Sequence, residues 1–256
     1  MSEVHSEFSP EKQLVMREIP HELAINLAAF RTAQAVADFS FYRLLKEEAY
    51  LFPKYYKSGD SVLDLACGLG RTTLLLHEMG LQVRGIDRSD LFIETARRRL
   101  PYLDLRVGSY DRIEEADSSF RHVLISLNGI DYAYPAAQRI AALQECARVL
   151  QPGGTLIYSS HNVKSLHWFS PYYRNHLLWK TRNSIKAFKG WDYVVEDGVY
   201  AFYSSPGFVV RQTEAVGLKL LEIRGFFKLG TGRLDRYLSP YLHYVFTKPE
   251  KSGESG

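Results

Sequence analysis

Apolar and polar positions follow two different rhythms along the chain. In the N-terminal fifth, apolar side chains recur at helical spacing, at Leu23, Ala24, Leu27, Phe30, Ala33, Ala37, Phe41 and Leu44. This pattern predicts two or three helices over residues 11–50, with a break at Pro53. From residue 61 the pattern changes to short apolar runs that alternate with helical stretches.

Five short apolar runs predict β-strands. They are SVLDLA (61–66), LQVRGID (81–87), LDLRVGS (103–109), HVLISLN (122–128) and TLIYSSH (155–161). Helical stretches cover 71–80, 89–100 and 136–150; Ser89 is expected to cap the second and Pro101 to end it. This alternation predicts a doubly wound α/β sheet with right-handed crossovers.

The alternation ends after residue 161. Residues 208–217 predict a helix, and KLLEIRGFF (219–227) and YLHYVFTK (241–248) predict two strands without a helix between them, which favours an antiparallel pair. We therefore expect a seven-stranded, mostly parallel sheet with an antiparallel last strand. The expected divisions are an N-terminal helical cap (1–57), an α/β core (58–160), a helical or irregular lid insertion (161–207), a C-terminal helix and hairpin (208–249) and a disordered tail (250–256).

Composition excludes several classes of protein. The chain has 256 residues, of which 46% are hydrophobic and 24% charged, so a mainly disordered chain, a collagen-like repeat and a coiled-coil rod are excluded. No apolar run approaches the ~18 residues of a membrane span, and the N-terminus lacks the apolar segment of a signal peptide. Two cysteines, Cys67 and Cys146, cannot build a disulfide framework, and the eight histidines show no metal-site spacing. We expect a cytoplasmic protein without a metal, and the net charge of +3 does not by itself indicate a nucleic-acid partner.

A glycine loop follows the first predicted strand, in VLDLACGLG (62–70). Gly68 and Gly70 let a ligand lie against the backbone, but Thr73 occupies the position of the third glycine of a dinucleotide loop. Asp64 would repel a pyrophosphate and attract an ammonium group. Asp87, at the end of the second strand, can accept hydrogen bonds from ribose hydroxyls. A ribose-containing ligand with a cation and no pyrophosphate matches S-adenosylmethionine, and a nicotinamide dehydrogenase is disfavoured.

Ordered motifs over residues 58–161 resemble those of the class I S-adenosylmethionine-dependent methyltransferases. They are VLDLACGLGR (62–71), GID (85–87), RVGSYD (106–111), SLNGIDY (126–132) and RVLQPGGTLIYSSHN (148–162). The resemblance implies a Rossmann-like sheet and S-adenosylmethionine as the cofactor, with S-adenosylhomocysteine as the product. It implies cofactor contacts from Asp64, Ala66, Gly68, Gly70, Asp87, Arg88, Ser109, Tyr110 and Asn128. The chain departs from the family at Ser109, where an aspartate is frequent; the Ser109 hydroxyl would replace it as acceptor, and Tyr110 would flank the base.

Three residues are candidates for the chemistry at the acceptor. His161 ends the fifth strand on the ligand side and can take a proton from a hydroxyl or an amine; the alternative is a hydrogen-bonded pocket histidine. Asp131 and Tyr132 follow the fourth strand, where they either act directly or form a helix cap and a pocket wall. Asn128 either holds the amino-acid part of the cofactor, faces the acceptor, or forms an Asx turn with Gly129.

Residues 161–190 have the most unusual composition. They hold six Lys and Arg and no Asp or Glu, and all three tryptophans lie between 168 and 191. One interpretation is a lid over the acceptor pocket that, with the N-terminal helices, closes over the cofactor. The other is a solvated basic face whose aromatic side chains pack on the core. The same composition also suits single-stranded RNA or anionic lipid.

The sequence thus predicts a methyltransferase that works by in-line displacement. The expected acceptor is an oxygen or nitrogen atom of a small molecule, anionic or aromatic in character, and the expected assembly is a monomer or a homodimer. The alternatives are an RNA or lipid methyltransferase that uses the basic aromatic segment, and a regulator or scaffold that binds the cofactor without turnover.

Overall fold

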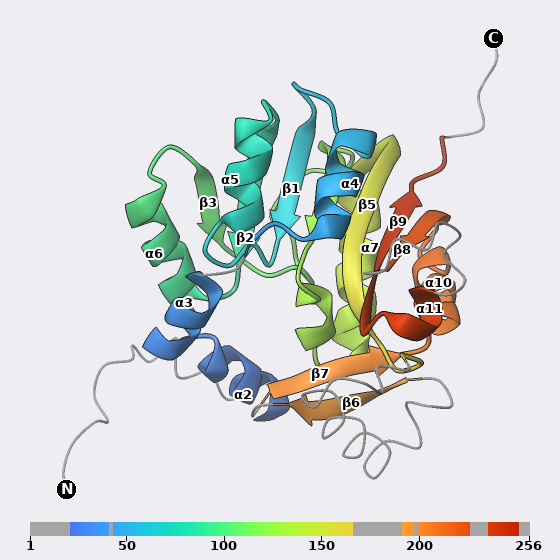
Figure 1. The fold of residues 1–256 in the computed structure, drawn as a ribbon. Coiled ribbons are helices and arrows are strands. Elements are labelled where there is room, and N and C mark those ends of the chain that lie inside the picture. Colours follow the sequence, from blue (N-terminus) through green and yellow to red (C-terminus); the bar gives the residue numbers. More distant parts are fainter. Residues whose placement is uncertain (1–20, 41–42, 166–190, 197–198, 226–234, 251–256) are drawn as a thin grey trace, which may run out of the picture.

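The computed structural model describes residues 21–40, 43–165, 191–196, 199–225 and 235–250. Its centre is a mixed β-sheet. Five strands lie parallel in the order β3-β2-β1-β4-β5 (Figure 1). Their bounds are β1 Ser61–Leu65, β2 Gln82–Asp87, β3 Asp104–Val107, β4 Phe120–Ile125 and β5 Leu150–Asn162. Beside β5 lies β9 (Tyr241–Thr247), antiparallel to it, and then β8 (Lys219–Arg224), antiparallel to β9. These seven strands confirm the predicted sheet and its antiparallel last strand.

Two further strands extend the sheet beyond the end of β4. β6 (Trp191–Glu196) and β7 (Val199–Ser204) form an antiparallel hairpin. β4 pairs with β5 only as far as Tyr158, and β7 pairs with the last two residues of β5, His161 and Asn162. The helical or irregular structure expected over residues 161–207 is therefore wrong for residues 191–196 and 199–204. Four consecutive residues of β7 are buried, so this strand does not show the alternation of a half-exposed strand. Residues 166–190 lie outside the described residues.

Nine helices are described. They are α2 His21–Ala29, α3 Ala33–Ser40, α4 Lys46–Tyr55, α5 Arg71–Glu78, α6 Asp90–Arg99, the 3₁₀ helix η1 Gly129–Tyr132, α7 Ala136–Val149, α10 Pro206–Glu214 and α11 Asp235–Leu238. Ser89 caps α6 as predicted, since its Oγ accepts a hydrogen bond from the N–H of Phe92 at 3.2 Å. The expected break at Pro53 is wrong: α4 runs through Pro53 to Tyr55, because buried Leu51 and Phe52 hold its last turn on the sheet.

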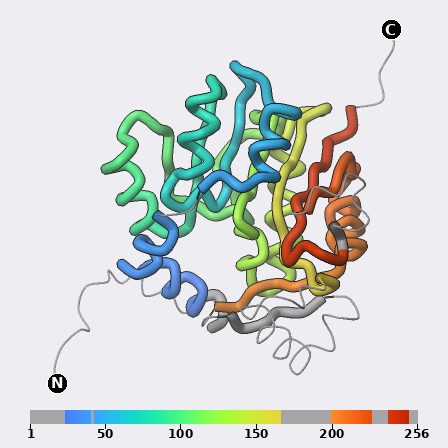
Figure 2. Tube along the Cα trace, in the orientation of Figure 1, coloured from blue at the N-terminus to red at the C-terminus, as the bar shows by residue number. Residues whose placement is uncertain are grey.

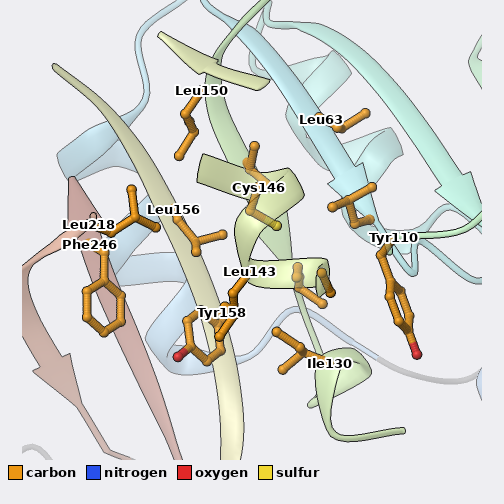
Figure 3. Packing of buried hydrophobic residues seen from close by; sticks show 14 of the residues in the cluster. Leu63, Tyr110, Ile130, Leu143, Cys146, Leu150, Leu156, Tyr158, Leu218 and Phe246 are labelled. Atoms are coloured by element: carbon orange, nitrogen blue, oxygen red, sulfur yellow. The ribbon is translucent and has the colours of Figure 1, made fainter. Parts of the chain in front are cut away.

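The hydrophobic core fills both faces of the sheet. On one face, buried side chains of α4 and α5 pack against side chains of β1, β4, β5 and β9. On the other face, Leu143 and Cys146 of α7 pack against Leu156 and Tyr158 of β5 (Figure 3). The carboxyl ends of the parallel strands lie beyond this core, and ligands of open α/β sheets bind at these ends.

Segments from distant parts of the chain meet at this carboxyl end. Helix α2 packs against β7 although about 170 residues separate them, and η1 contacts β7 as well. Figure 2 shows helix α2 (blue) beside strand β7 (orange), below the ends of the parallel strands. The N-terminal helices and η1 line a cavity.

Candidate active site

A cavity opens at the carboxyl ends of β1, β2 and β4. It contains about 930 Å³ of empty space, part of it open to solvent. Its walls come from the glycine loop, the start of α6, η1 and the two N-terminal helices. They include Asn26, Leu27, Phe30, Phe39, Ala66, Cys67, Gly68, Leu69, Arg71, Thr72, Asp87, Arg88, Ser89, Phe92, Tyr110, Ser126, Leu127, Gly129 and Tyr132.

The glycine loop lies directly against this cavity. Gly68 and Gly70 have φ angles of 56° and 80°, in the left-handed region that glycine adopts without strain. Ala66, at 54°, shares this conformation without being glycine, as does Leu127, at 47°, on the facing loop. The two loops are closely packed, because a Cβ atom at Gly129 would lie 2.8 Å from that of Ala66. Backbone in such conformations is held by its surroundings and is typical of ligand sites.

Asp87 is the carboxylate in the cavity wall. Its Oδ2 accepts a hydrogen bond from the N–H of Gly68 and its Oδ1 from the N–H of Ser89, both at 2.8 Å. Burial raises the pKa of Asp87, and the two backbone hydrogen bonds oppose the rise. The carboxylate is thus fixed in orientation, and its remaining lone pairs can accept hydrogen bonds from a diol.

Asp64 lies under the loop and does not line the cavity. It is fully buried, and its Oδ2 accepts hydrogen bonds from the hydroxyls of Thr72 and Thr73, both at 2.7 Å. Its Oδ1 is buried without a hydrogen-bond partner among the described residues. Burial raises the pKa of Asp64 to about 6. Thr73, at the position of the missing third glycine, therefore ties α5 to β1.

Arg88 organises the far end of the cavity. Its guanidinium donates hydrogen bonds to Ser109 and Asp111 and lies 4.8 Å from the centre of the Tyr110 ring. Tyr110 lines the cavity, whereas Ser109 bonds to Arg88 and Asp111 and does not. Asp111 is not among the site residues predicted from the sequence. Its place as an acid two positions after Ser109 could have indicated it.

A second missed cluster lies in the cavity wall, where Arg71 and Ser126 line the cavity and Glu48 lies behind them. Arg71 donates two hydrogen bonds to Glu48 of α4, at 2.6 and 2.8 Å, and one to Ser126 at 2.6 Å. Burial alone would raise the pKa of Glu48, but the hydrogen bonds and charge of Arg71 lower it. Arg71 could have been noticed in the sequence because it directly follows the glycine loop. Nothing in the sequence indicates that Glu48 is its partner.

His161 is held by Asp131. Asp131 Oδ2 lies 2.8 Å from His161 Nδ1 and accepts a hydrogen bond from the His161 backbone N–H at 2.7 Å. Asp131 Oδ1 faces Arg139 at 2.5 Å, and both of these side chains are fully buried. Asp131 therefore cannot touch a substrate and acts as a positioning residue. His161 remains 15% exposed.

Tyr132 and Asn128 flank this histidine. The Tyr132 ring stands edge-on to His161, 6.5 Å between centroids, and lines the cavity. Asn128, with a left-handed φ of 57°, places its Nδ2 3.2 Å from His161 Nε2. It does not line the cavity, and its N–H donates to Ser159 Oγ at 2.8 Å. The Asn128 amide therefore lies beside His161 and outside the cavity lining.

Comparison with known proteins agrees with this geometry. Residues 62–154 match the family model described as a methyltransferase domain. The chain is 28% identical over 139 residues to a probable S-adenosylmethionine-dependent methyltransferase of Mycolicibacterium smegmatis, covering 54% of this chain and 52% of that protein. A demethylmenaquinone methyltransferase of Beutenbergia cavernae is 36% identical over 107 residues, 42% of this chain and 43% of that protein.

Residues 62–154 therefore form a methyltransferase domain. The fold agrees: a solved S-adenosylmethionine-dependent methyltransferase from Methanosarcina mazei superposes with a TM-score of 0.61 at 21% identity, over 78% of this chain and 98% of that one. The chain spans about half the length of the curated relatives it matches.

The residues present fit the cofactor of the methyltransferase domain, S-adenosylmethionine. Glycines at 68 and 70 leave the loop without side chains, and Asp87 presents acceptors for ribose hydroxyls. Within the described ranges, no three His, Cys, Asp or Glu side chains gather as a metal site would need. Among those same residues, no helix has the length and apolarity to cross a membrane.

Proposed function

We propose that this chain transfers a methyl group from S-adenosylmethionine to an oxygen or nitrogen atom of a small molecule. The observation that carries the proposal is the cavity itself, which joins the glycine loop and Asp87 to a wall that ends beside His161. Asp87, Gly68, Gly70 and Ala66 would hold the cofactor, and Arg88 with Tyr110 would flank its base. When bound, the sulfonium of the cofactor supplies an already activated methyl group.

His161 is the proposed base. Donation of the Nδ1 proton to Asp131 leaves the lone pair of the ring on Nε2, the atom that faces Asn128. Nε2 would take the proton that an acceptor O–H or N–H releases during attack on the methyl carbon. Asp131 would stabilise the resulting imidazolium, and Tyr132 would wall the acceptor.

An aromatic rather than an anionic acceptor suits the described wall. Phe30 lies 5.1 Å from Tyr132 and 5.9 Å from Phe39, ring centre to ring centre. The two arginines that line the cavity are neutralised, Arg71 by Glu48 and Arg88 by Asp111. Relatives named demethylmenaquinone methyltransferases support a small-molecule acceptor. RNA or lipid binding would rest on the basic aromatic segment 161–190, of which residues 166–190 lie outside the described residues.

Methyl-labelled cofactor tests the proposal. The purified chain is incubated with labelled S-adenosylmethionine and, separately, with a small-molecule filtrate, total RNA and lipid vesicles. We expect label in the small-molecule fraction. Label only in RNA or lipid would overturn the acceptor class, and cofactor binding with no label in any fraction would indicate a regulator.

A further inference from the structure

Helices α2 and α3, called here the α2–α3 cap, bridge the cavity from its cofactor side to its acceptor side. On the cofactor side, Ser89 Oγ donates a hydrogen bond to the carbonyl of Phe30 at 2.8 Å, and Arg31 pairs with Asp90 at 3.0 Å. Ser89 is also the residue whose N–H binds Asp87. The cap is thus anchored at Ser89, two residues after Asp87, the residue proposed to bind the ribose.

On the acceptor side, the cap is held by Asn26. Its Oδ1 accepts a hydrogen bond from the N–H of Tyr200 at 2.7 Å, and its Nδ2 donates to the carbonyl of the same residue at 2.9 Å. The Nδ2 also lies 3.2 Å from the carbonyl oxygen of Tyr132. Asn26 is 2% exposed, so its amide is satisfied by backbone groups alone. The backbone N–H and carbonyl of Tyr200 point away from β6. The Asn26 amide forms the two hydrogen bonds that the backbone of a neighbouring strand would otherwise form with these groups.

The two segments that Asn26 holds are those that frame His161. Tyr203 of β7 stacks on the His161 ring, 4.5 Å between centroids and 27° between planes. Tyr132 of η1 stands edge-on to the same ring. A single amide in the N-terminal helix therefore fixes both neighbours of the proposed base.

We propose that Asn26 is a positioning residue that couples cofactor binding to the shape of the acceptor site. A ligand on Asp87 and Ser89 steadies the α2–α3 cap, and the cap, through Asn26, fixes β7 and η1 around His161. This inference rests on the proposed function, because it assumes a cofactor on Asp87.

Hydrogen exchange with S-adenosylhomocysteine as the probe tests this coupling without knowledge of the acceptor. In the wild-type chain, we expect the probe to slow exchange in residues 61–70 and 82–89 and also in residues 24–32 and 199–204. In Asn26→Ala, the slowing at 61–70 and 82–89 persists and the slowing at 199–204 is lost. Gln34→Ala is the matched control, since this amide of α3 is exposed and bonds only within its helix, to Asp38; it should behave as the wild type.

The outcomes separate this inference from the function on which it rests. Equal slowing at 199–204 in the wild type and in Asn26→Ala overturns the coupling, as does the absence of any slowing there in a wild-type chain that binds the probe. A wild-type chain that does not bind the probe in calorimetry overturns the proposed function instead. If Asn26→Ala does not fold, Asn26→Asp serves, because it keeps the acceptor for the Tyr200 N–H and removes the donor.

Discussion

Asp131 holds His161 through one carboxylate oxygen, which accepts hydrogen bonds from the backbone N–H at 2.7 Å and from Nδ1 of the ring at 2.8 Å. This arrangement fixes both the place of the histidine at the end of β5 and the tautomer of its ring. The other carboxylate oxygen is neutralised by Arg139, which also lies 4.3 Å above the ring of Phe202 in β7. The buried ion pair thus joins α7, η1, β5 and β7 behind the proposed base.

His161→Gln should lose turnover while cofactor binding stays unchanged. A general base contributes typically about 10²–10⁴-fold to a rate, and a loss in this range is expected with an O–H or N–H acceptor. His77→Gln, which replaces an exposed histidine on α5, is the control. Full activity of His161→Gln would show that positioning alone suffices and that no base acts at this position.

Asp131→Asn should destabilise the fold strongly. The substitution leaves the Arg139 guanidinium buried with no countercharge, and breaking a buried pair in this way costs about 3–5 kcal/mol. Asp117→Asn breaks the exposed pair with Arg148 and should cost less than about 1 kcal/mol. Urea denaturation measures both free energies of unfolding, and similar losses in the two variants would contradict the role of the buried pair.

Asp64→Asn should change how stability depends on pH. Since burial raises the pKa of Asp64 to about 6, the folded chain binds this proton more tightly than the unfolded chain. The stabilising contribution is complete below the unfolded pKa near 4 and is lost as the pH rises through 6. The free energy of unfolding of Asp64→Asn minus that of the wild type should therefore rise by about 2 kcal/mol between pH 4 and pH 7. Both free energies are measured without cofactor. A difference between them that does not vary with pH would contradict the raised pKa of Asp64.

The succession of strands and helices along the chain and the place of the glycine loop could be predicted from local pattern, because each depends on a few consecutive residues. Gly68 and Gly70 lie in the loop after β1 and Asp87 ends β2, and these parallel strands bring their carboxyl ends together. The β6–β7 hairpin could not be predicted in this way, because residues 201–204 are all buried and β7 lacks the alternation of a half-exposed strand.

The supporting contacts were beyond prediction for a different reason. Asn26 and Tyr200 are 174 positions apart, and Glu48 and Arg71 belong to different helices. No spacing rule links such residues; only the tertiary fold does. The motifs place cofactor ligands at Asp64, Ser109 and Asn128. In the structure none of the three lines the cavity; they form hydrogen bonds with Thr73, Arg88 and His161, respectively.

Asp87→Ala should lose most of the affinity for the cofactor. Hydrogen bonds to a charged group contribute about 1.5–3 kcal/mol, so we expect binding about 10–150-fold weaker. Glu78→Ala, which removes an exposed carboxylate at the end of α5, is the control and should bind as the wild type does.

Calorimetric titration of the wild type and of Asp87→Ala with S-adenosylmethionine, S-adenosylhomocysteine and NADH is the most direct test of the account. The account predicts that the wild type binds the first two ligands and not NADH, and that Asp87→Ala binds them at least about tenfold more weakly. Binding of NADH alone, or unchanged affinity in Asp87→Ala, would contradict it.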